Sequence, residues 1–164
     1  MSTPLRKRNV CIAILLLFLA GLWMPGQARD RHNEVPQTTQ NSNKEPVAMK
    51  ILLKLDGQSL PATLDNSPAA RDFFSLLPLT LTLEDYAATE KIAYLPRKLS
   101  IQEAPAGIDP DAGDITYYAP WGNLAIFHRD FRYSPGLVHL GRIEGNIDAL
   151  RRAGKRQVTI TVAD

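Results

Sequence analysis

The segment GDITYYAPWGNLAIFHRDFRYSPG, residues 113–136, contains two expected strands and the turn that joins them. Residues 114–118 and 123–127 are rich in the aliphatic, β-branched and aromatic side chains that favour strands. Pro, Trp, Gly and Asn at 120–123 supply a tight turn between antiparallel neighbours. Apolar side chains occupy both faces of the second strand, which is typical of a strand covered on both sides. The segment therefore predicts neighbouring strands within a packed β-domain.

Similar signals extend in both directions from this pair of strands. The run LTLTL places leucines on one face and threonines on the other. Asp56-Gly57 is a strong turn signal between two further strands. The additional expected strands are residues 49–55, 59–64, 79–83, 91–95, 137–143 and 157–162. About eight short strands at near-even spacing predict a mainly β fold, a closed eight-stranded β-barrel.

Two short helices complete the predicted fold. Ser67 caps a helix that starts at Pro68, has Asp72 near its positive end and stops at Pro78. A second helix is expected over residues 146–153, with a glycine directly after it. The two helices are expected to plug the barrel ends with Phe73, Leu77, Ile147 and Leu150.

Residues 1–28 predict an export signal. A basic start precedes an uncharged apolar run at 10–22, and small residues precede a cleavage site after Ala28. The apolar run is shorter than the ~20 residues that a membrane-spanning helix needs. We therefore expect cleavage, membrane contact only during export, and a periplasmic location. Residues 29–46 are polar and predict a disordered linker, which leaves 47–164 as the folded domain.

Charge and composition exclude several functions. Of the 19 basic residues, three lie in the export signal, so the exported chain has 16 basic against 17 acidic residues. This balance does not predict nucleic-acid binding, which needs a basic face. Cleavage removes Cys11, the only cysteine, and His128 and His139 alone are too few for a metal site. There is no phosphate-binding glycine loop or dinucleotide fingerprint, so no cofactor is expected.

Two longer blocks resemble a known family. ARDFFSLLPLTLTLEDYAATEKIAYLPRKLS at 69–100 and GDITYYAPWGNLAIFHRDFRYSPGLVHLGRIEG at 113–145 are similar to the bacterial cyclophilin-like fold proteins. The resemblance runs from about Ile51 to the C-terminus. It implies the cyclophilin architecture, an eight-stranded barrel with two helices. A shared fold does not by itself supply an activity.

The same resemblance implies one alternative function. True cyclophilins isomerise prolyl bonds with an arginine beside an aromatic groove, and Phe127-His128-Arg129 looks like the start of their Phe-His-Arg block. The next residues, 130–136, lack the Gln-Gly-Gly-Asp that follows in that family. Arg129 is thus a weak candidate for the catalytic residue of a divergent isomerase. In the other interpretation Phe127 faces the barrel interior, His128 points outward and Arg129 pairs with a surface acid.

Aromatic residues near this block are candidates for a ligand groove. Tyr117 and Tyr118 are adjacent in a strand, so one faces the core and the other the surface or a groove. Trp121 either anchors a ligand or covers the barrel mouth. The candidate groove residues are Tyr118, Trp121, Phe131 and Tyr133. They favour a non-catalytic binding module for a peptide or small molecule, with the divergent isomerase or an undescribed small-molecule enzyme as alternatives.

The acidic residues predict surface positions. Residues 105–113 hold Asp109 and Asp111, with Asp114 just beyond, and they lack the bidentate glutamate and the spacing of a calcium loop, so a solvated loop is expected over 105–113. Glu84-Asp85 and Glu90-Lys91 are interpreted as surface charge. None of these carboxylates is predicted to bind a metal or to act as an acid or base.

Overall fold

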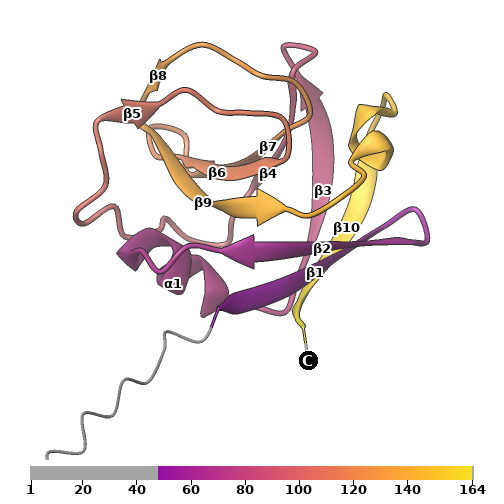
Figure 1. The fold of residues 1–164 in the computed structure, drawn as a ribbon, viewed down its shortest axis with the longest axis horizontal. Helices are drawn as coiled ribbons and strands as arrows, with labels where there is room; N and C mark the ends of the chain where they lie inside the picture. Colours follow the sequence, from indigo (N-terminus) through magenta and orange to yellow (C-terminus); the bar gives the residue numbers. More distant parts are fainter. Residues whose placement is uncertain (1–47, 164) are drawn as a thin grey trace, which may run out of the picture. The chain divides into compact units, whose positions relative to one another are not determined.

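The structure, a computed structural model, describes residues 48–163. Eight antiparallel strands close into a barrel in the order β1-β10-β3-β4-β7-β6-β9-β2, and the two-residue strands β5 and β8 form a separate pair (Figure 1). The bounds are β1 Met49–Leu55, β2 Gln58–Leu64, β3 Leu79–Tyr86, β4 Glu90–Tyr94, β5 Gly107–Ile108, β6 Asp114–Tyr118, β7 Asn123–Phe127, β8 Ser134–Pro135, β9 Leu137–Ile143 and β10 Arg156–Val162. The predicted closed eight-stranded barrel is confirmed. The predicted export signal, its cleavage site after Ala28 and the linker over 29–46 lie outside the described residues.

The β1–β2 hairpin shows how local sequence sets the register. Asp56 and Gly57 have φ angles of 52° and 76°, as the two central residues of a type I′ turn require. The turn pairs Leu55 with Gln58. This register points Leu53 and Leu55 into the barrel, where each is 1% exposed.

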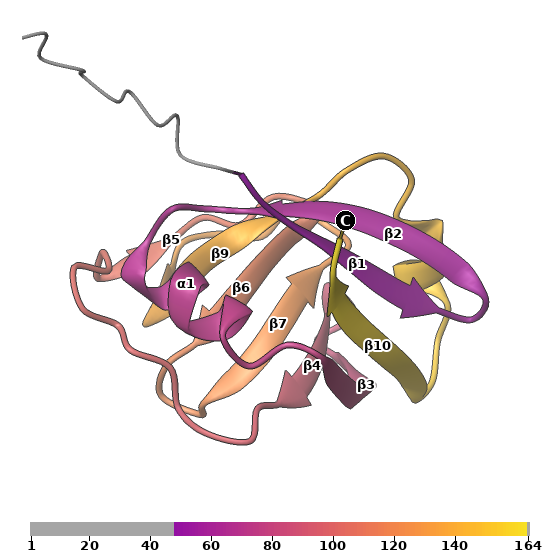
Figure 2. The same ribbon diagram turned by 90° about the horizontal axis from the view of Figure 1, so that it is seen from below.

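Short helical segments close the two ends of the barrel core. Helix α1 (Pro68–Phe74) starts after Ser67, whose side chain accepts a backbone N–H from the first turn, as predicted. Its Phe73 is fully buried in the core. The 3-10 turn η1 (Asp148–Arg151) lies at the opposite end and buries Leu150 (Figures 1 and 2). No helix within residues 48–163 combines the length and apolar character needed to cross a bilayer.

Two details of these ends differ from the prediction. The second helix is only a single 3-10 turn, in which the Leu150 N–H donates to the Ile147 carbonyl at 2.9 Å, because so short a segment cannot offset the cost of nucleating an α-helix. Asp72 does not lie in the first turn of α1, where its carboxylate would interact with the positive end of the helix dipole. Its carboxylate binds Arg97 at 2.6 Å and accepts the N–H of Ser100 at 2.7 Å, which ties the loop after β4 to the helix.

A second apolar cluster lies on the outer face of the barrel. Along β7, Leu124 and Ile126 belong to the barrel core, whereas Ala125 and Phe127 belong to the outer cluster. Residues of the loops that carry β5 and β8 pack against this cluster. The strand is therefore covered on both sides, as predicted. The expectation that Phe127 faces the interior is wrong, because both alternating sets on β7 are apolar and the period alone does not tell them apart.

Candidate functional site

A groove lies on the outer face of the barrel, where β4, β7, β6 and β9 meet the loop that carries β8. Its volume is about 190 Å³. Ala125 lies between the larger Asn123 and Phe127 on the outward face of β7, so its small side chain leaves room for the hollow. The lining comes from these strands and the adjacent turns and loop: Tyr86, Ala87, Glu90, Ile92, Tyr118, Trp121, Asn123, Ala125, Phe127, Phe131, Ser134 and Leu137.

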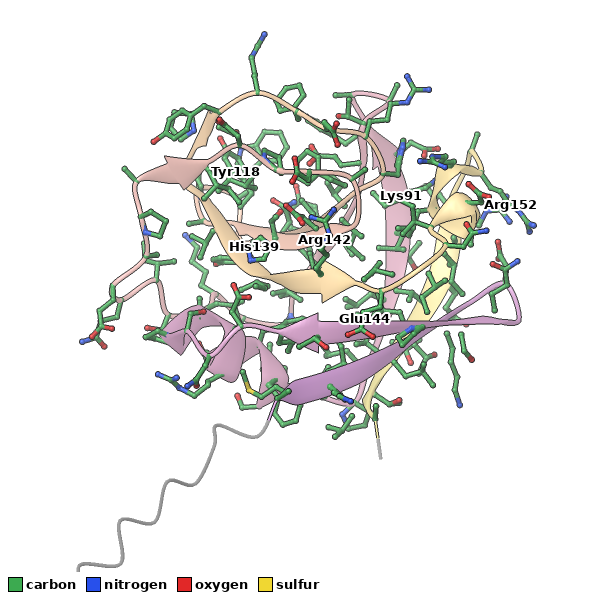
Figure 3. The ribbon with its side chains drawn as sticks, in the orientation of Figure 1. Lys91, Tyr118, His139, Arg142, Glu144 and Arg152 are labelled. Carbon is green, nitrogen blue, oxygen red and sulfur yellow. The ribbon has the colours of Figure 1, made fainter. Side chains whose placement is uncertain are left out.

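Aromatic rings from different strands meet along the groove. Tyr86 ends β3, and Trp121 lies in the turn between β6 and β7. Their ring centroids are 5.5 Å apart in an edge-to-face arrangement, and Trp121 makes a second such contact with Tyr118, also at 5.5 Å. Tyr118 lies close to the β5–β8 loops (Figure 3). Phe127 and Phe131 stack at 6.2 Å. These five rings give the groove apolar walls that are held in place by ring contacts.

The turn that presents Tyr86 is strained. Its central residues, Ala87 and Ala88, have φ angles of 48° and 56°, and the Thr89 N–H donates to the Tyr86 carbonyl at 3.2 Å. The left-handed conformation costs a non-glycine residue ~1–2 kcal/mol. Strain of this kind concentrates at functional sites. Ala87 itself lines the groove, so the strained turn is part of it.

Replacement of Ala88 by glycine should relieve this strain. We expect Ala88→Gly to raise the free energy of unfolding by about 0.5–1 kcal/mol, because the relief exceeds the entropy that glycine adds to the unfolded chain. Ala153→Gly, at an exposed position without a positive φ, is the matched control and should lower that free energy slightly. Urea unfolding measures both variants, and equal effects would contradict a strained turn.

Two polar side chains lie toward opposite ends of the groove. In the register of β4 and β7, Glu90 is opposite Phe127 and Asn123 is opposite Tyr94. Burial raises the pKa of Glu90 from 4.5 to about 7. Asn123 is 1% exposed, and its amide donates to the Leu124 carbonyl at 3.2 Å. Its Oδ1 has no hydrogen-bond partner among the described residues, so it is a free acceptor.

The barrel is similar to known proteins in sequence and in fold. The sequence profile of the cyclophilin-like family matches residues 53–161. This chain belongs to the cyclophilin-like family. The solution structure of a hypothetical protein from Archaeoglobus fulgidus is similar to this cyclophilin-like protein, with a TM-score of 0.59 and 17% sequence identity over 74% of this chain and 99% of that one. At that identity the likeness shows the fold alone. A comparison with curated proteins gave no match.

The cyclophilin-like barrel brings three of the four predicted groove residues together. Tyr118, Trp121 and Phe131 line the groove, whereas Tyr133 does not and is 52% exposed. Arg129 is exposed and also lies outside the lining. The adjacent tyrosines diverge as predicted, since Tyr118 reaches the groove while its neighbour is in the core. Arg129 therefore does not line the groove that the predicted aromatic residues form.

Glu90 and Lys91 are not the surface charges that the sequence predicted. They point to opposite faces of β4, Glu90 into the groove and Lys91 into the barrel, where it is 0% exposed. Lys91 pairs with Asp85 and donates to the Arg152 carbonyl at 2.7 Å, at the barrel end where η1 lies (Figure 3). Alternation alone separates the two side chains. Only the register with β7 shows which face carries the groove, and no local signal in the sequence gives that register.

Other residues of the groove lining were also missed. Tyr86, Asn123 and Ala125 line the hollow, but none carries a signal that sets it apart from an ordinary strand or turn residue. Tyr86 joins the site through its contact with Trp121, which lies far from it in the sequence. Ala125 contributes through its small side chain, which leaves a hollow only because larger side chains flank it on the same face of β7.

His128 is buried in this cyclophilin-like barrel, so its predicted outward position is wrong. Its Nδ1 has no hydrogen-bond partner within residues 48–163. Burial lowers the pKa of His128, and the charges of Lys91 and Arg129 lower it further. The side chain is therefore kept neutral near neutral pH, and it lies outside the groove lining.

His139 belongs to a polar network on β9. Its Nδ1 lies 2.6 Å from Asp65, and its Nε2 lies 3.5 Å from Asp114. Asp114 also accepts a hydrogen bond from Arg142 at 2.6 Å, and Arg142 lies on β9 together with His139 (Figure 3). Asp114 is the first residue of β6, as the predicted strand over 114–118 requires, and it is only 5% exposed, so it is a buried partner of β9. Nowhere in residues 48–163 do three or more His, Asp or Glu side chains gather in a way that could hold a metal ion.

Proposed function

We propose that this protein is a small-molecule-binding module whose outer groove holds one ring-sized apolar group. The observation that carries the proposal is the convergence of Tyr86, Tyr118, Trp121, Phe127 and Phe131 on one hollow of about 190 Å³. An engineered apolar cavity of ~150 Å³ is large enough to take up benzene. The groove therefore has room for a single ring with a short substituent. A free small molecule suits it better than an extended peptide, because one ring already fills most of the space.

The binding role is supported over prolyl isomerisation by the position of Arg129. An isomerase needs a guanidinium that can donate to the proline nitrogen inside the groove, since weakening the amide resonance lowers the rotation barrier. Arg129 is exposed and outside the lining. The leader-like residues 1–28 support the further proposal that the module acts after export, in the periplasm.

The proposal is tested with 2-phenylethanol, a neutral one-ring probe, by isothermal titration calorimetry on the full chain. We expect binding to the wild type that Trp121→Ala weakens about tenfold, since the substitution removes a ring that contacts both Tyr118 and Tyr86. Tyr133→Ala is the matched control, because Tyr133 is an exposed ring outside the lining, 52% exposed against 47% for Trp121. This control should leave the dissociation constant within about twofold. Equal effects of the two substitutions, or no binding to the wild type, would overturn the proposal.

A further inference from the structure

Glu90 stands out among the residues that line the groove. Within the described part of the chain it is the only lining residue with an acidic or basic side chain. Desolvation is the only influence that shifts its pKa, and that pKa is raised, so no neighbouring cation compensates its charge. Half-buried carboxylates without a partner are costly, because burial disfavours the charged form. The groove therefore contains a carboxyl group that has no cationic partner within residues 48–163.

The neighbours of Glu90 explain why it is alone. In the sheet register Tyr86 lies opposite it on β3 and Phe127 lies opposite it on β7. Lys91, the next residue, points to the other face of β4 and is already paired with Asp85. On the β7 side, buried His128 and exposed Arg129 follow Phe127, and neither lines the groove. The side chains packed around the carboxyl group are therefore mainly aromatic.

We propose that the ligand of the groove is an organic cation, a primary amine carried on a short chain from a flat ring, with Glu90 as its counter-charge. This inference rests on the proposed binding function and adds the chemical class of the ligand. A cation at Glu90 would gain a charge-assisted hydrogen bond. It would also lie beside aromatic faces, which attract cations. An anion would meet the carboxylate and find no basic side chain in the described lining.

The spacing along the strands fits such a ligand. Ala125 is opposite Ile92 in the register, and Glu90 lies two residues from Ile92 along β4. At ~3.3 Å per residue this is roughly 7 Å. A ring placed over the small side chain of Ala125 would therefore need a linker of about two carbons to bring a nitrogen within reach of Glu90.

The far end of the groove adds a second acceptor. Asn123 lies four residues from the Glu90 end along the register, and its buried Oδ1 is unpartnered within residues 48–163. A buried acceptor without a donor costs free energy until a donor reaches it. An N–H or O–H on the distal edge of the ring would satisfy Asn123. Because this Oδ1 is itself buried, a ligand donor would reach it only if the Asn123 side chain turned toward the groove, so Glu90 carries the choice of ligand.

The test uses isothermal titration calorimetry on the full chain with three probes of similar length: phenethylamine, 2-phenylethanol and 3-phenylpropionate. At about pH 8 we expect phenethylamine to bind wild type at least about tenfold more tightly than 2-phenylethanol does, and 3-phenylpropionate to bind more weakly than either. Glu90→Gln should remove the amine's advantage while it leaves the 2-phenylethanol affinity within about twofold. Glu84→Gln is the matched control, since Glu84 is an exposed acid that pairs with Lys155 and lies outside the lining.

The pH dependence gives an independent measurement. Because an amine requires the ionised form of Glu90, its affinity should rise between about pH 5.5 and pH 8 in wild type and stay flat in Glu90→Gln. If 2-phenylethanol and phenethylamine bind equally and Glu90→Gln changes neither, the groove is a binding site but the cation inference is overturned. If none of the three probes binds, the binding function fails and takes the inference with it.

Discussion

Gly141→Ala is expected to prevent the barrel from closing. The seam between β2 and β9 consists of three residue pairs, one of which joins Gly141 to Leu64. A Cβ at position 141 would lie 2.3 Å from the Thr63 carbonyl oxygen and 2.6 Å from the Leu64 Cα. Both are backbone atoms, so the clash is relieved only if the strands separate. We expect a loss of more than about 4 kcal/mol in the free energy of unfolding, or no cooperative transition at all.

Gly145→Ala is the control that distinguishes the steric clash at position 141 from the cost of a left-handed backbone conformation. Gly145 follows β9 with a φ of 82°, and no atom lies within 4 Å of the position that an alanine Cβ would take there. Alanine at this position should cost only ~1–2 kcal/mol for the left-handed conformation. Circular dichroism and urea unfolding of both variants give the comparison. Similar stabilities for the two variants would mean that β2 does not constrain position 141.

The barrel was more predictable than its ends. Strict alternation in LTLTL and the Asp56-Gly57 turn are local signals, and both predicted features are present. The β5–β8 pair was not predicted, because two residues per strand carry no periodicity. The second helix was expected over residues 146–153, but only Asp148–Arg151 form a 3-10 turn, because a short segment cannot offset the cost of helix nucleation.

The groove was only partly predictable because it depends on contacts between strands. Alternation shows that Tyr117 and Tyr118 point to opposite faces, but it does not by itself show which of them faces the groove. Phe131 and Tyr133 could not be distinguished, because the loop that holds them has no regular period, and only Phe131 reaches the lining. For Glu90 the sequence predicts only a surface charge. Its partner strand, which places it among aromatic rings, lies more than thirty residues away in the sequence.

Truncation of Lys91 is the second substitution with a large expected effect. Its side chain is 0% exposed, and its ammonium group pairs with Asp85 and donates to the carbonyls of Arg152 and Gly154 at 2.7 and 3.2 Å. Lys91→Ala leaves a cavity and two carbonyls without their donor. We expect the free energy of unfolding to fall by about 3 kcal/mol. Lys91→Met fills the same space without the charge and should recover about half of that loss.

Unfolding measured at acidic pH distinguishes the stability that comes from the Lys91–Asp85 ion pair from the stability lost to the cavity. The hydrogen bond from Lys91, and then that from the Gly154 N–H, lower the pKa of Asp85 below its ordinary 3.8. A carboxylate whose pKa is lower in the folded state stabilises the fold above its ordinary pKa and loses that contribution as the pH falls through the folded value. The difference in the free energy of unfolding between wild type and Lys91→Met, measured by urea unfolding, should therefore shrink below about pH 3.8. The difference between Lys91→Met and Lys91→Ala should persist, because a cavity does not titrate. A wild-type advantage over Lys91→Met that stays constant across this range would show that the pair adds no pH-dependent stability, and that Lys91 is kept for its two carbonyl contacts alone.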